Sequence, residues 1–188
     1  QWLQELFKDR PGITLAMVKD DFDDESLPIR ERTRIWSDFI RRTYPKIDVI
    51  FSSEDYGESF AYNYGARHIL FDRERVAFDV SASRIRANPS AYWEYFPQPV
   101  RPYFVSRICS YGPEITGNST LAANLARQYH TEFVPEVARE MITTNNFTVA
   151  EIIAIGLAHD LRVREKSRIA NKLLFCDTDV ITTQIYSL

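Results

Sequence analysis

Hydrophobic positions follow two different patterns along this chain. Residues 29–43 carry apolar side chains at near-helical intervals, which is the pattern of an amphipathic helix. Short continuous apolar runs between polar residues indicate buried strands instead. The predicted helices span residues 1–8, 29–43, 58–64, 119–129, 136–143 and 148–170. The predicted strands span residues 13–18, 49–51, 68–71, 103–110, 132–134 and 173–176. Alternation of strands and helices at this spacing predicts an α/β fold in which helices wrap parallel sheets.

A proline-rich stretch divides this alternation into two halves. Residues 88–104 hold four of the nine prolines, and proline blocks the continuation of a helix. The stretch also carries too many aromatic side chains for a free linker. We therefore predict a stiff connector that packs on a domain surface, with a domain boundary near residue 103.

Composition places the chain among ordinary globular proteins. It has 188 residues, 45% of them hydrophobic and 26% charged, which excludes a disordered chain or a fibrous repeat. The net charge of −3 offers no basic field for nucleic acid, and no apolar run approaches the roughly 18 to 20 residues of a membrane span. Its two cysteines, Cys109 and Cys176, fall in predicted strands, and this favours a reducing, cytoplasmic location.

A glycine-containing loop in the second half has the chemistry of a phosphate site. Residues 112–120 read Gly-Pro-Glu-Ile-Thr-Gly-Asn-Ser-Thr, between a predicted strand and a predicted helix. Gly112 and Gly117 would let backbone N–H groups turn toward phosphate oxygens, and the following helix adds its positive N-terminal end. The hydroxyl of Ser119, next to Thr120, stands where a Mg²⁺ ligand belongs, but Asn118 replaces the usual lysine. The competing interpretation is a plain glycine turn that caps a helix.

Two carboxylates follow predicted strands of the same half. Asp177 ends the strand 173–176, where nucleotide-binding sheets place the carboxylate that holds Mg²⁺. Glu136 follows the strand 132–134 as a candidate base, and Arg139 stands one turn later as an anion contact. The alternatives are a solvated aspartate and an i,i+3 surface ion pair.

The first half offers a second anion site. Ser81 and Ser83 are natural helix-capping residues, and Arg86 lies one helical turn after Ser83. Two hydroxyls, free N–H groups and a guanidinium suit a triphosphate, although a capped helix with a surface arginine has the same spacing.

Weaker candidates for substrate contacts also occur in the first half. Ser53 and Glu54 follow the strand 49–51, at the sheet edge where open α/β sheets bind ligands. Trp36 is either a stacking platform or a core residue.

These motifs together resemble a known family. Ser81-x-Ser83-x-Ile85-Arg86 matches the I-S-x-[ST]-x-I-R element of nicotinamide-mononucleotide adenylyltransferases. The proline-rich joint, the Ser52-Ser53-Glu54 segment, the phosphate loop and residues 177–184 resemble the bifunctional NadR-type family, in which an adenylyltransferase domain precedes a ribosylnicotinamide kinase domain. The resemblance spans essentially the whole chain.

The resemblance implies two Rossmann-like parallel-sheet domains in tandem, the second of P-loop kinase type. Residues 1–103 would be the end of an adenylyltransferase domain, and residues 104–188 the start of the kinase domain. ATP and Mg²⁺ would be cofactors, with nicotinamide mononucleotide and ribosylnicotinamide as the small-molecule substrates. The residues implied at ATP are Ser81, Ser83 and Arg86 in the first domain, and Gly112, Gly117, Asn118, Ser119 and Thr120 in the second. Asp177 and Glu136 would serve as metal or base carboxylates, with the two roles open.

Three departures from the family pattern shape the expectations. The chain opens without Met inside a helical pattern and lacks the family's His-x-Gly-His motif, so we expect an internal fragment that is inactive by itself. Its kinase half stops before the family's lid segments. Asn118 is expected to impair the kinase half. An ATP-sensing module and a kinase with another acceptor remain open alternatives for the function, and the chain could also form a homo-oligomer.

Overall fold

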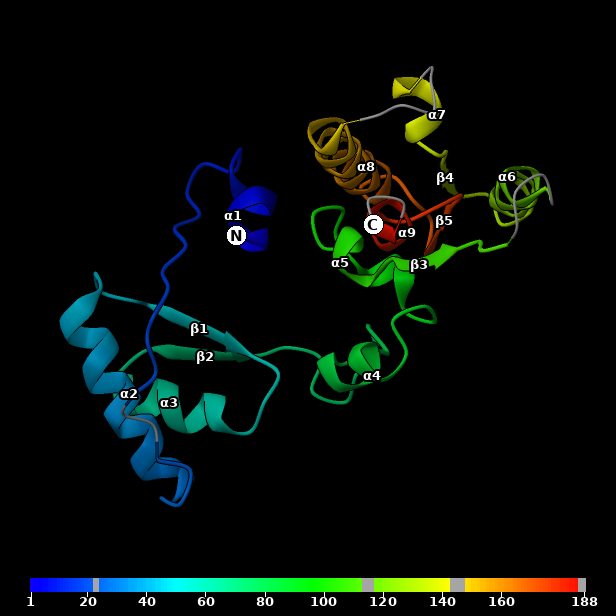
Figure 1. Ribbon diagram of the computed structural model, residues 1–188. Coiled ribbons are helices and arrows are strands. Elements are labelled where there is room, and N and C mark those ends of the chain that lie inside the picture. Colours follow the sequence, from blue (N-terminus) through cyan, green and yellow to red (C-terminus); the bar gives the residue numbers. More distant parts are fainter. Residues whose placement is uncertain (22–23, 113–116, 143–147, 186–188) are drawn as a thin grey trace. The chain divides into compact units, whose positions relative to one another are not determined.

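The computed structural model describes residues 1–21, 24–112, 117–142 and 148–185, and the chain divides into two compact units (Figure 1). The smaller unit is Thr14–Ala82, and the larger unit combines Gln1–Ile13 with Ser83–Leu188. None of the described helices is long and apolar enough to cross a membrane.

The smaller unit is a pair of parallel strands with two helices. Its elements are α2 (Ile29–Thr43), β1 (Val49–Ser52), α3 (Tyr56–Tyr64) and β2 (Arg67–Leu70). β1 and β2 pair in parallel from Val49 opposite Arg67. Helices α2 and α3 pack together around Ser37, a fully buried residue whose hydroxyl donates to the carbonyl oxygens of Thr33 and Phe60.

The larger unit contains a three-stranded parallel sheet in the order β3-β5-β4. Its strands are β3 (Ser106–Cys109), β4 (Glu132–Val134) and β5 (Leu173–Cys176). Its helices include α1 (Trp2–Phe7), α5 (Arg101–Phe104), α6 (Asn118–Gln128), α7 (Ala138–Met141), α8 (Val149–Ser167) and α9 (Val180–Ile185). A short helix, α4 (Ala82–Ala87), and a 3-10 turn, Trp93–Tyr95, precede α5.

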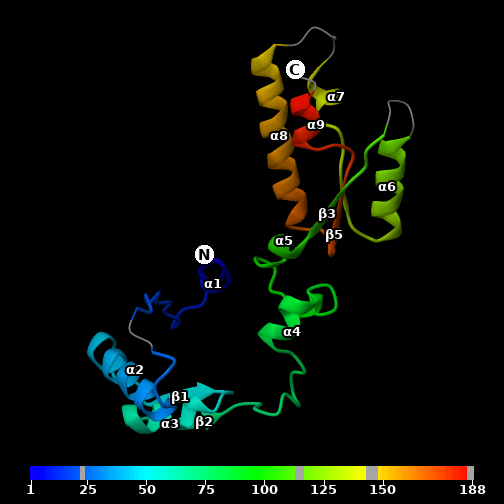
Figure 2. The same cartoon turned by 60° about the horizontal axis from the view of Figure 1, so that its bottom comes forward.

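Helices α6 and α8 cover opposite faces of this sheet (Figure 2). Successive side chains of a strand point to opposite faces, and β5 distributes its residues accordingly. Phe175 packs with Ala122 and Ala126 of α6, whereas Leu174 packs in a cluster with Val163 of α8. The predicted α/β fold with parallel sheets is therefore confirmed.

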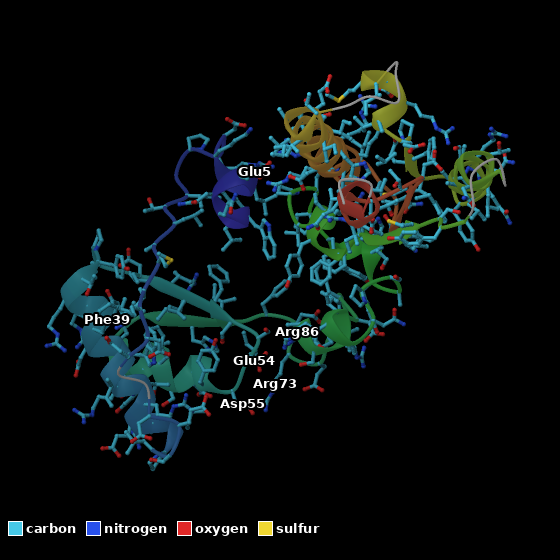
Figure 3. All side chains as sticks on the ribbon, in the orientation of Figure 1. Glu5, Phe39, Glu54, Asp55, Arg73 and Arg86 are labelled. Carbon is cyan, nitrogen blue, oxygen red and sulfur yellow. The ribbon has the colours of Figure 1, made fainter. Side chains whose placement is uncertain are left out.

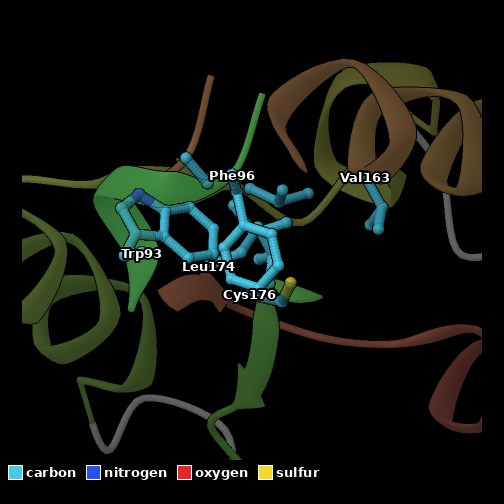
Figure 4. Close-up of a cluster of buried hydrophobic side chains, with 8 residues drawn as sticks. Trp93, Phe96, Val163, Leu174 and Cys176 are labelled. Atoms are coloured by element: carbon cyan, nitrogen blue, oxygen red, sulfur yellow. The ribbon is translucent and has the colours of Figure 1, made fainter. Parts of the chain in front are cut away.

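The proline-rich joint contributes to the core of the larger unit. Trp93 is 2% exposed and Phe96 is 6% exposed, and both belong to the cluster around Leu174 and Cys176 (Figure 4). Arg101 lies over the Trp93 ring at 5.7 Å from its centroid. The aromatic side chains thus anchor the joint more deeply than surface packing alone would.

The predicted strand at residues 13–18 is wrong. These residues form no strand, and Ile13, Leu15 and Met17 are exposed. A strand needs a neighbouring strand for its backbone hydrogen bonds, and none of the described strands pairs with this segment. The strand predicted from residue 103 begins instead at Ser106, because Pro102 lies in the first turn of α5. The domain boundary predicted near residue 103 stays a prediction.

Candidate functional site

The predicted phosphate loop leads into α6 through a left-handed glycine. Gly117 has φ +88° and stands immediately before the first helical residue. A Cβ at Gly117 would meet no other atom within 4 Å, so the backbone conformation, not crowding, requires glycine there. The first N–H groups of a helix have no partner within it, so this end of α6 offers donors to an anion. Residues 113–116 of the loop lie outside the described residues.

Asn118 is the first residue of α6, and its side chain is neutral. The Ser110 hydroxyl lies 3.5 Å from the Asn118 side-chain oxygen, which is a long and weak hydrogen bond. Ser119 is half-buried and Thr120 is exposed, both in the first turn. The loop therefore presents hydroxyl and amide groups, but its sequence places no lysine at residue 118.

Asp177 emerges beside this loop from the neighbouring strand. Cys109 of β3 is the register partner of Cys176 of β5, and the Ser110 N–H donates to the Cys176 carbonyl at 3.0 Å. The chain after β3 and the chain after β5 consequently leave the same edge of the sheet. Asp177 is only 9% exposed, and no described residue pairs with its carboxylate.

This donor set fits Mg²⁺. A nearly buried carboxylate without a described cationic partner is costly unless a cation joins it. Mg²⁺ prefers oxygen ligands and usually takes one or two from protein, with phosphate oxygens and waters completing its shell. The described residues contain no cluster of three or more His, Cys, Asp or Glu side chains that would hold a metal alone. Asp177 and the Ser119 hydroxyl are the residues suited to this ion.

A second link between the two strand ends was not predicted. The Tyr111 hydroxyl donates to the Asp179 carboxylate, which also accepts from the Thr182 N–H at 2.9 Å and the Thr182 hydroxyl at 3.1 Å. The bond to Asp179 raises the pKa of Tyr111 to about 12. Burial opposes ionisation of Asp179, but the bonds from Tyr111 and Thr182 outweigh it and lower the pKa of that carboxyl. Asp179 therefore caps the first turn of α9 and links this turn to Tyr111 at the start of the phosphate loop. The Asp-x-x-Thr spacing in the sequence could have predicted this cap.

The two candidate residues after β4 form an ion pair with each other. The Arg139 Nε lies 2.5 Å from a Glu136 carboxylate oxygen, at i,i+3 spacing. Farther along α7, Glu140 pairs with Arg162 of α8 at 2.6 Å. Glu136 thus has a positive partner of its own, and among the described residues no other predicted site residue forms an ion pair with it.

His159 of α8 is a buried polar residue that the sequence analysis did not single out. It is 4% exposed, and its Nδ1 atom has no hydrogen-bond partner among the described residues. Burial lowers the pKa of this imidazole and so favours its neutral form.

In the smaller unit, the polar residues after β1 are already paired. Glu54 forms an ion pair with Arg75 at 3.0 Å, and Asp55 pairs with Arg73 at 2.5 Å (Figure 3). Ser53 lies between Ser52 and Glu54 and is half-buried. Trp36 is half-buried and meets Phe39 edge-on, with 6.2 Å between ring centroids.

The backbone of α3 at Gly57 comes very close to the Ser52 side chain of β1. The Ser52 hydroxyl and the His68 Nε2 atom are 2.8 Å apart across β1 and β2. A Cβ at Gly57 would lie 1.7 Å from the Ser52 hydroxyl oxygen, so only glycine fits there. The sequence analysis missed His68, whose partner is distant in sequence.

The Ser/Arg turn lies around α4. Ser81 directly precedes the helix, Ser83 lies in its first turn, and Arg86 is exposed one turn later. The division between the two units falls after Ala82, so Ser81 belongs to the smaller unit and the other two residues to the larger. Their role at ATP stays a prediction.

Comparisons with known proteins identify the relationship. A family model described as an AAA domain matches residues 107–188. The trifunctional NAD biosynthesis/regulator proteins NadR of Salmonella typhimurium strain LT2 and of Escherichia coli strain K12 are each 29% identical over 198 aligned residues. Each alignment covers 99% of this chain and 47% of the relative. The chain is homologous to NadR. It spans about half the length of these NadR relatives.

Solved NadR structures share the fold. A crystal structure of NadR protein in complex with NAD and AMP-PNP aligns with a TM-score of 0.79 at 22% identity, covering 98% of this chain and 56% of that one. A NadR protein in complex with NR gives 0.77 at 23% identity, covering 99% and 56%. The predicted NadR resemblance is confirmed, and so is the fold class, with a P-loop-type second half.

Proposed function

We propose that the larger unit binds ATP together with Mg²⁺ and transfers the γ-phosphoryl group to ribosylnicotinamide. The observation that carries this proposal is the Gly117 turn into α6 beside the nearly buried, uncompensated Asp177 of the neighbouring strand. Homology to NadR, a protein named for NAD biosynthesis, supports the choice of substrate class.

Each residue of this site has a role that its position suits. The free N–H groups at the start of α6, including those of Ser119 and Thr120, would bind phosphate oxygens. Asp177 and the Ser119 hydroxyl would hold Mg²⁺, which supplies charge neutralisation at the β- and γ-phosphates. With Asp177 at the metal, Glu136 would accept the proton of the acceptor hydroxyl, and Arg139 would contact an anion once released from Glu136.

We expect phosphoryl transfer to be slow, because neutral Asn118 stands where the phosphate loop usually has lysine. A charged donor is about twice as strong as a neutral one, and the asparagine amide is shorter than a lysine side chain. Backbone N–H groups and the metal ligands remain, so ATP binding persists while phosphoryl transfer is impaired.

We propose the end of a nicotinamide-mononucleotide adenylyltransferase domain for residues 1–103. Ser81, Ser83 and Arg86 would hold ATP phosphates, and Ser53, Glu54 and Trp36 would contact the substrate. The 188-residue sequence contains no His-x-Gly-His motif, so the chain alone is expected to form no NAD. Detection of NAD from nicotinamide mononucleotide and ATP by the purified chain would contradict this assignment.

The kinase proposal is tested by product formation. Because the chain by itself is expected to be inactive, the full-length protein is incubated with ATP, Mg²⁺ and ribosylnicotinamide or, in parallel, with other nucleosides, and phosphorylated products are separated by chromatography. Slow, metal-dependent formation of nicotinamide mononucleotide is expected. A preference for another nucleoside would reassign the acceptor, and tight ATP binding with no transfer to any acceptor would favour an ATP-sensing module.

A further inference from the structure

A pocket of about 310 Å³ opens in the larger unit where its strands begin. Its walls come from α1, the proline-rich joint, the start of β3 and the C-terminal end of α8, the helix that precedes β5. The lining side chains on which the argument rests are Trp2, Glu5, Gln98, Arg107, Arg164 and Arg168. The phosphate loop follows the opposite ends of the strands, so this pocket is separate from the site described above. Its volume lies in the range of small-molecule sites.

Three guanidinium groups line this pocket with little negative charge to balance them. Arg107 and Arg168 form no ion pair within the described part of the chain. Arg164 pairs with Asp160 at 2.7 Å, and Glu5 is the one acidic residue among those described that line the pocket. Basic residues at the end of a helix offset its dipole, but Arg107 belongs to a strand, so the dipole does not explain why all three line one cavity. A cavity of this charge attracts an anion.

Contacts between segments distant in sequence hold the walls of the pocket together. The Gln98 side-chain amide donates to the Arg168 carbonyl oxygen and holds the joint against the end of α8. The Trp2 ring meets Tyr103 edge-on, with 5.2 Å between ring centroids, and this contact places α1 beside α5. Trp2 remains 42% exposed, so part of its indole is accessible to a ligand. A cavity whose walls are already fixed loses little freedom when a ligand enters.

We propose that this pocket binds a ribonucleoside monophosphate. Guanidinium groups bind phosphate through charge-assisted, often bidentate hydrogen bonds, which assigns the phosphate to Arg107 and Arg168. A carboxylate accepts hydrogen bonds from ribose hydroxyls, and Glu5 is placed to do so. The exposed indole of Trp2 offers an aromatic surface on which a base can stack. Phosphate, sugar and base thus match the three kinds of groups that line the cavity, whereas a bare phosphate would use the arginines alone.

Binding to the purified chain tests this proposal independently of the proposed kinase and adenylyltransferase reactions. AMP is titrated calorimetrically in the presence of EDTA, which removes the Mg²⁺ on which the phosphate loop is expected to depend. Saturable binding is expected, and Arg107→Gln and Arg168→Gln should each weaken it about tenfold or more, as for the loss of a charge-assisted hydrogen bond. Arg127→Gln is the matched control, at an exposed arginine in the last turn of α6, and should leave the affinity for AMP unchanged.

Related ligands separate the contacts to phosphate, sugar and base. Adenosine lacks the phosphate and should bind about tenfold or more weakly than AMP. Ribose 5-phosphate lacks the base, so Trp2→Ala should weaken the binding of AMP and leave that of ribose 5-phosphate unchanged. 2′-Deoxy-AMP lacks one hydroxyl and should bind about fivefold more weakly than AMP, and Glu5→Ala should remove this difference.

The substituted side chains are exposed, so the circular dichroism spectrum and the thermal midpoint of each variant should match those of the wild-type chain. No binding of AMP by the wild-type chain would overturn the proposal, as would an affinity for AMP that survives both arginine substitutions. Adenosine that binds as tightly as AMP would overturn the assignment of the phosphate to the arginines. Inorganic phosphate that binds as tightly as AMP would reduce the pocket to an anion site, and that result also overturns the proposal.

Discussion

Asn118→Lys should speed phosphoryl transfer by the proposed kinase half of the full-length protein. The substitution places a unit charge at the first residue of α6, beside the Gly117 turn. It removes only the long 3.5 Å hydrogen bond from the Ser110 hydroxyl to the Asn118 oxygen, so little is lost in the folded state. A cation at a helix N-terminus opposes the helix dipole, and this should lower the free energy of unfolding by about 0.3–1 kcal/mol.

The expected gain in ATP binding free energy is larger than this loss of folding stability. A hydrogen bond to a charged group contributes about 1.5–3 kcal/mol, against about 0.5–1.5 kcal/mol for a neutral pair. The difference of about 1–1.5 kcal/mol corresponds to ATP binding that is about 5- to 12-fold tighter. One preorganised donor at charge that develops in the transition state changes a rate by about 10²- to 10³-fold, and we expect an increase of that size in kcat.

The assay is ribosylnicotinamide phosphorylation by the full-length protein with Asn118, Asn118→Lys or Asn118→Met, measured side by side at saturating ATP. Methionine matches much of the length of lysine without its charge, so Asn118→Met should remain as slow as wild type. Equal rates in Asn118→Lys and wild type would show that another group supplies the missing charge, and the account of this loop would then be refuted. A matching increase in Asn118→Met would assign the gain to side-chain length.

The remaining predictions concern three glycines and the two cysteines. Gly57→Ala should lower the free energy of unfolding by about 1–3 kcal/mol in urea titrations, because the new Cβ would lie 1.7 Å from the Ser52 hydroxyl oxygen. Gly156→Ala should raise the free energy of unfolding by about 0.5–1 kcal/mol, because a Cβ there would meet no atom within 4 Å. Equal effects of Gly57→Ala and Gly156→Ala would contradict the packing argument. Gly117→Ala should lower the free energy of unfolding by about 1–2 kcal/mol and weaken ATP binding, because φ is +88° at this residue. An unchanged calorimetric unfolding midpoint together with unchanged ATP affinity would exclude a strained turn. Burial raises the pKa of Cys109 and raises that of Cys176 to about 12, so neither thiol should react with iodoacetamide at pH 8 until the chain unfolds. Unfolded thiols ionise near 9.0, so stability should fall as pH rises from about 9 toward about 12, and a flat profile would contradict the burial of Cys176.

Local patterns predicted most of the elements. The strands at residues 132–134 and 173–176 were predicted with the bounds the structure has. Residues 173–176 are a continuous apolar run, whereas the strand 132–134 has only two apolar residues after Glu132. Residues 13–18 resemble the run at 173–176 but remain outside any strand. Hydrophobic spacing reports which residues favour burial, but strand formation also depends on a neighbouring strand that the local sequence does not reveal.

The candidate site was predictable to the extent that its chemistry is local. Gly117 and Ser119 stand at the start of α6 and Asp177 directly after β5, and both boundaries are marked in the sequence itself. The bond from Tyr111 to Asp179 and the contact of Ser52 with His68 were missed, since each joins residues on separate strands or loops. Such contacts follow from strand order, which the periodicity of one segment does not encode.

The pairing of the Gly117 loop with Asp177 is tested most directly by the dependence of ATP binding on Mg²⁺. Affinity for ATP is measured calorimetrically with and without Mg²⁺ for the wild-type chain, Asp177→Asn and the matched control Asp160→Asn on α8. Mg²⁺ should tighten ATP binding about tenfold or more in wild type and in Asp160→Asn, as expected for a charge-assisted contact of about 1.5–3 kcal/mol. Asp177→Asn should bind ATP equally with and without Mg²⁺. A full Mg²⁺ effect in Asp177→Asn, or no ATP binding by the wild-type chain, would contradict a nucleotide site built from this loop and this carboxylate.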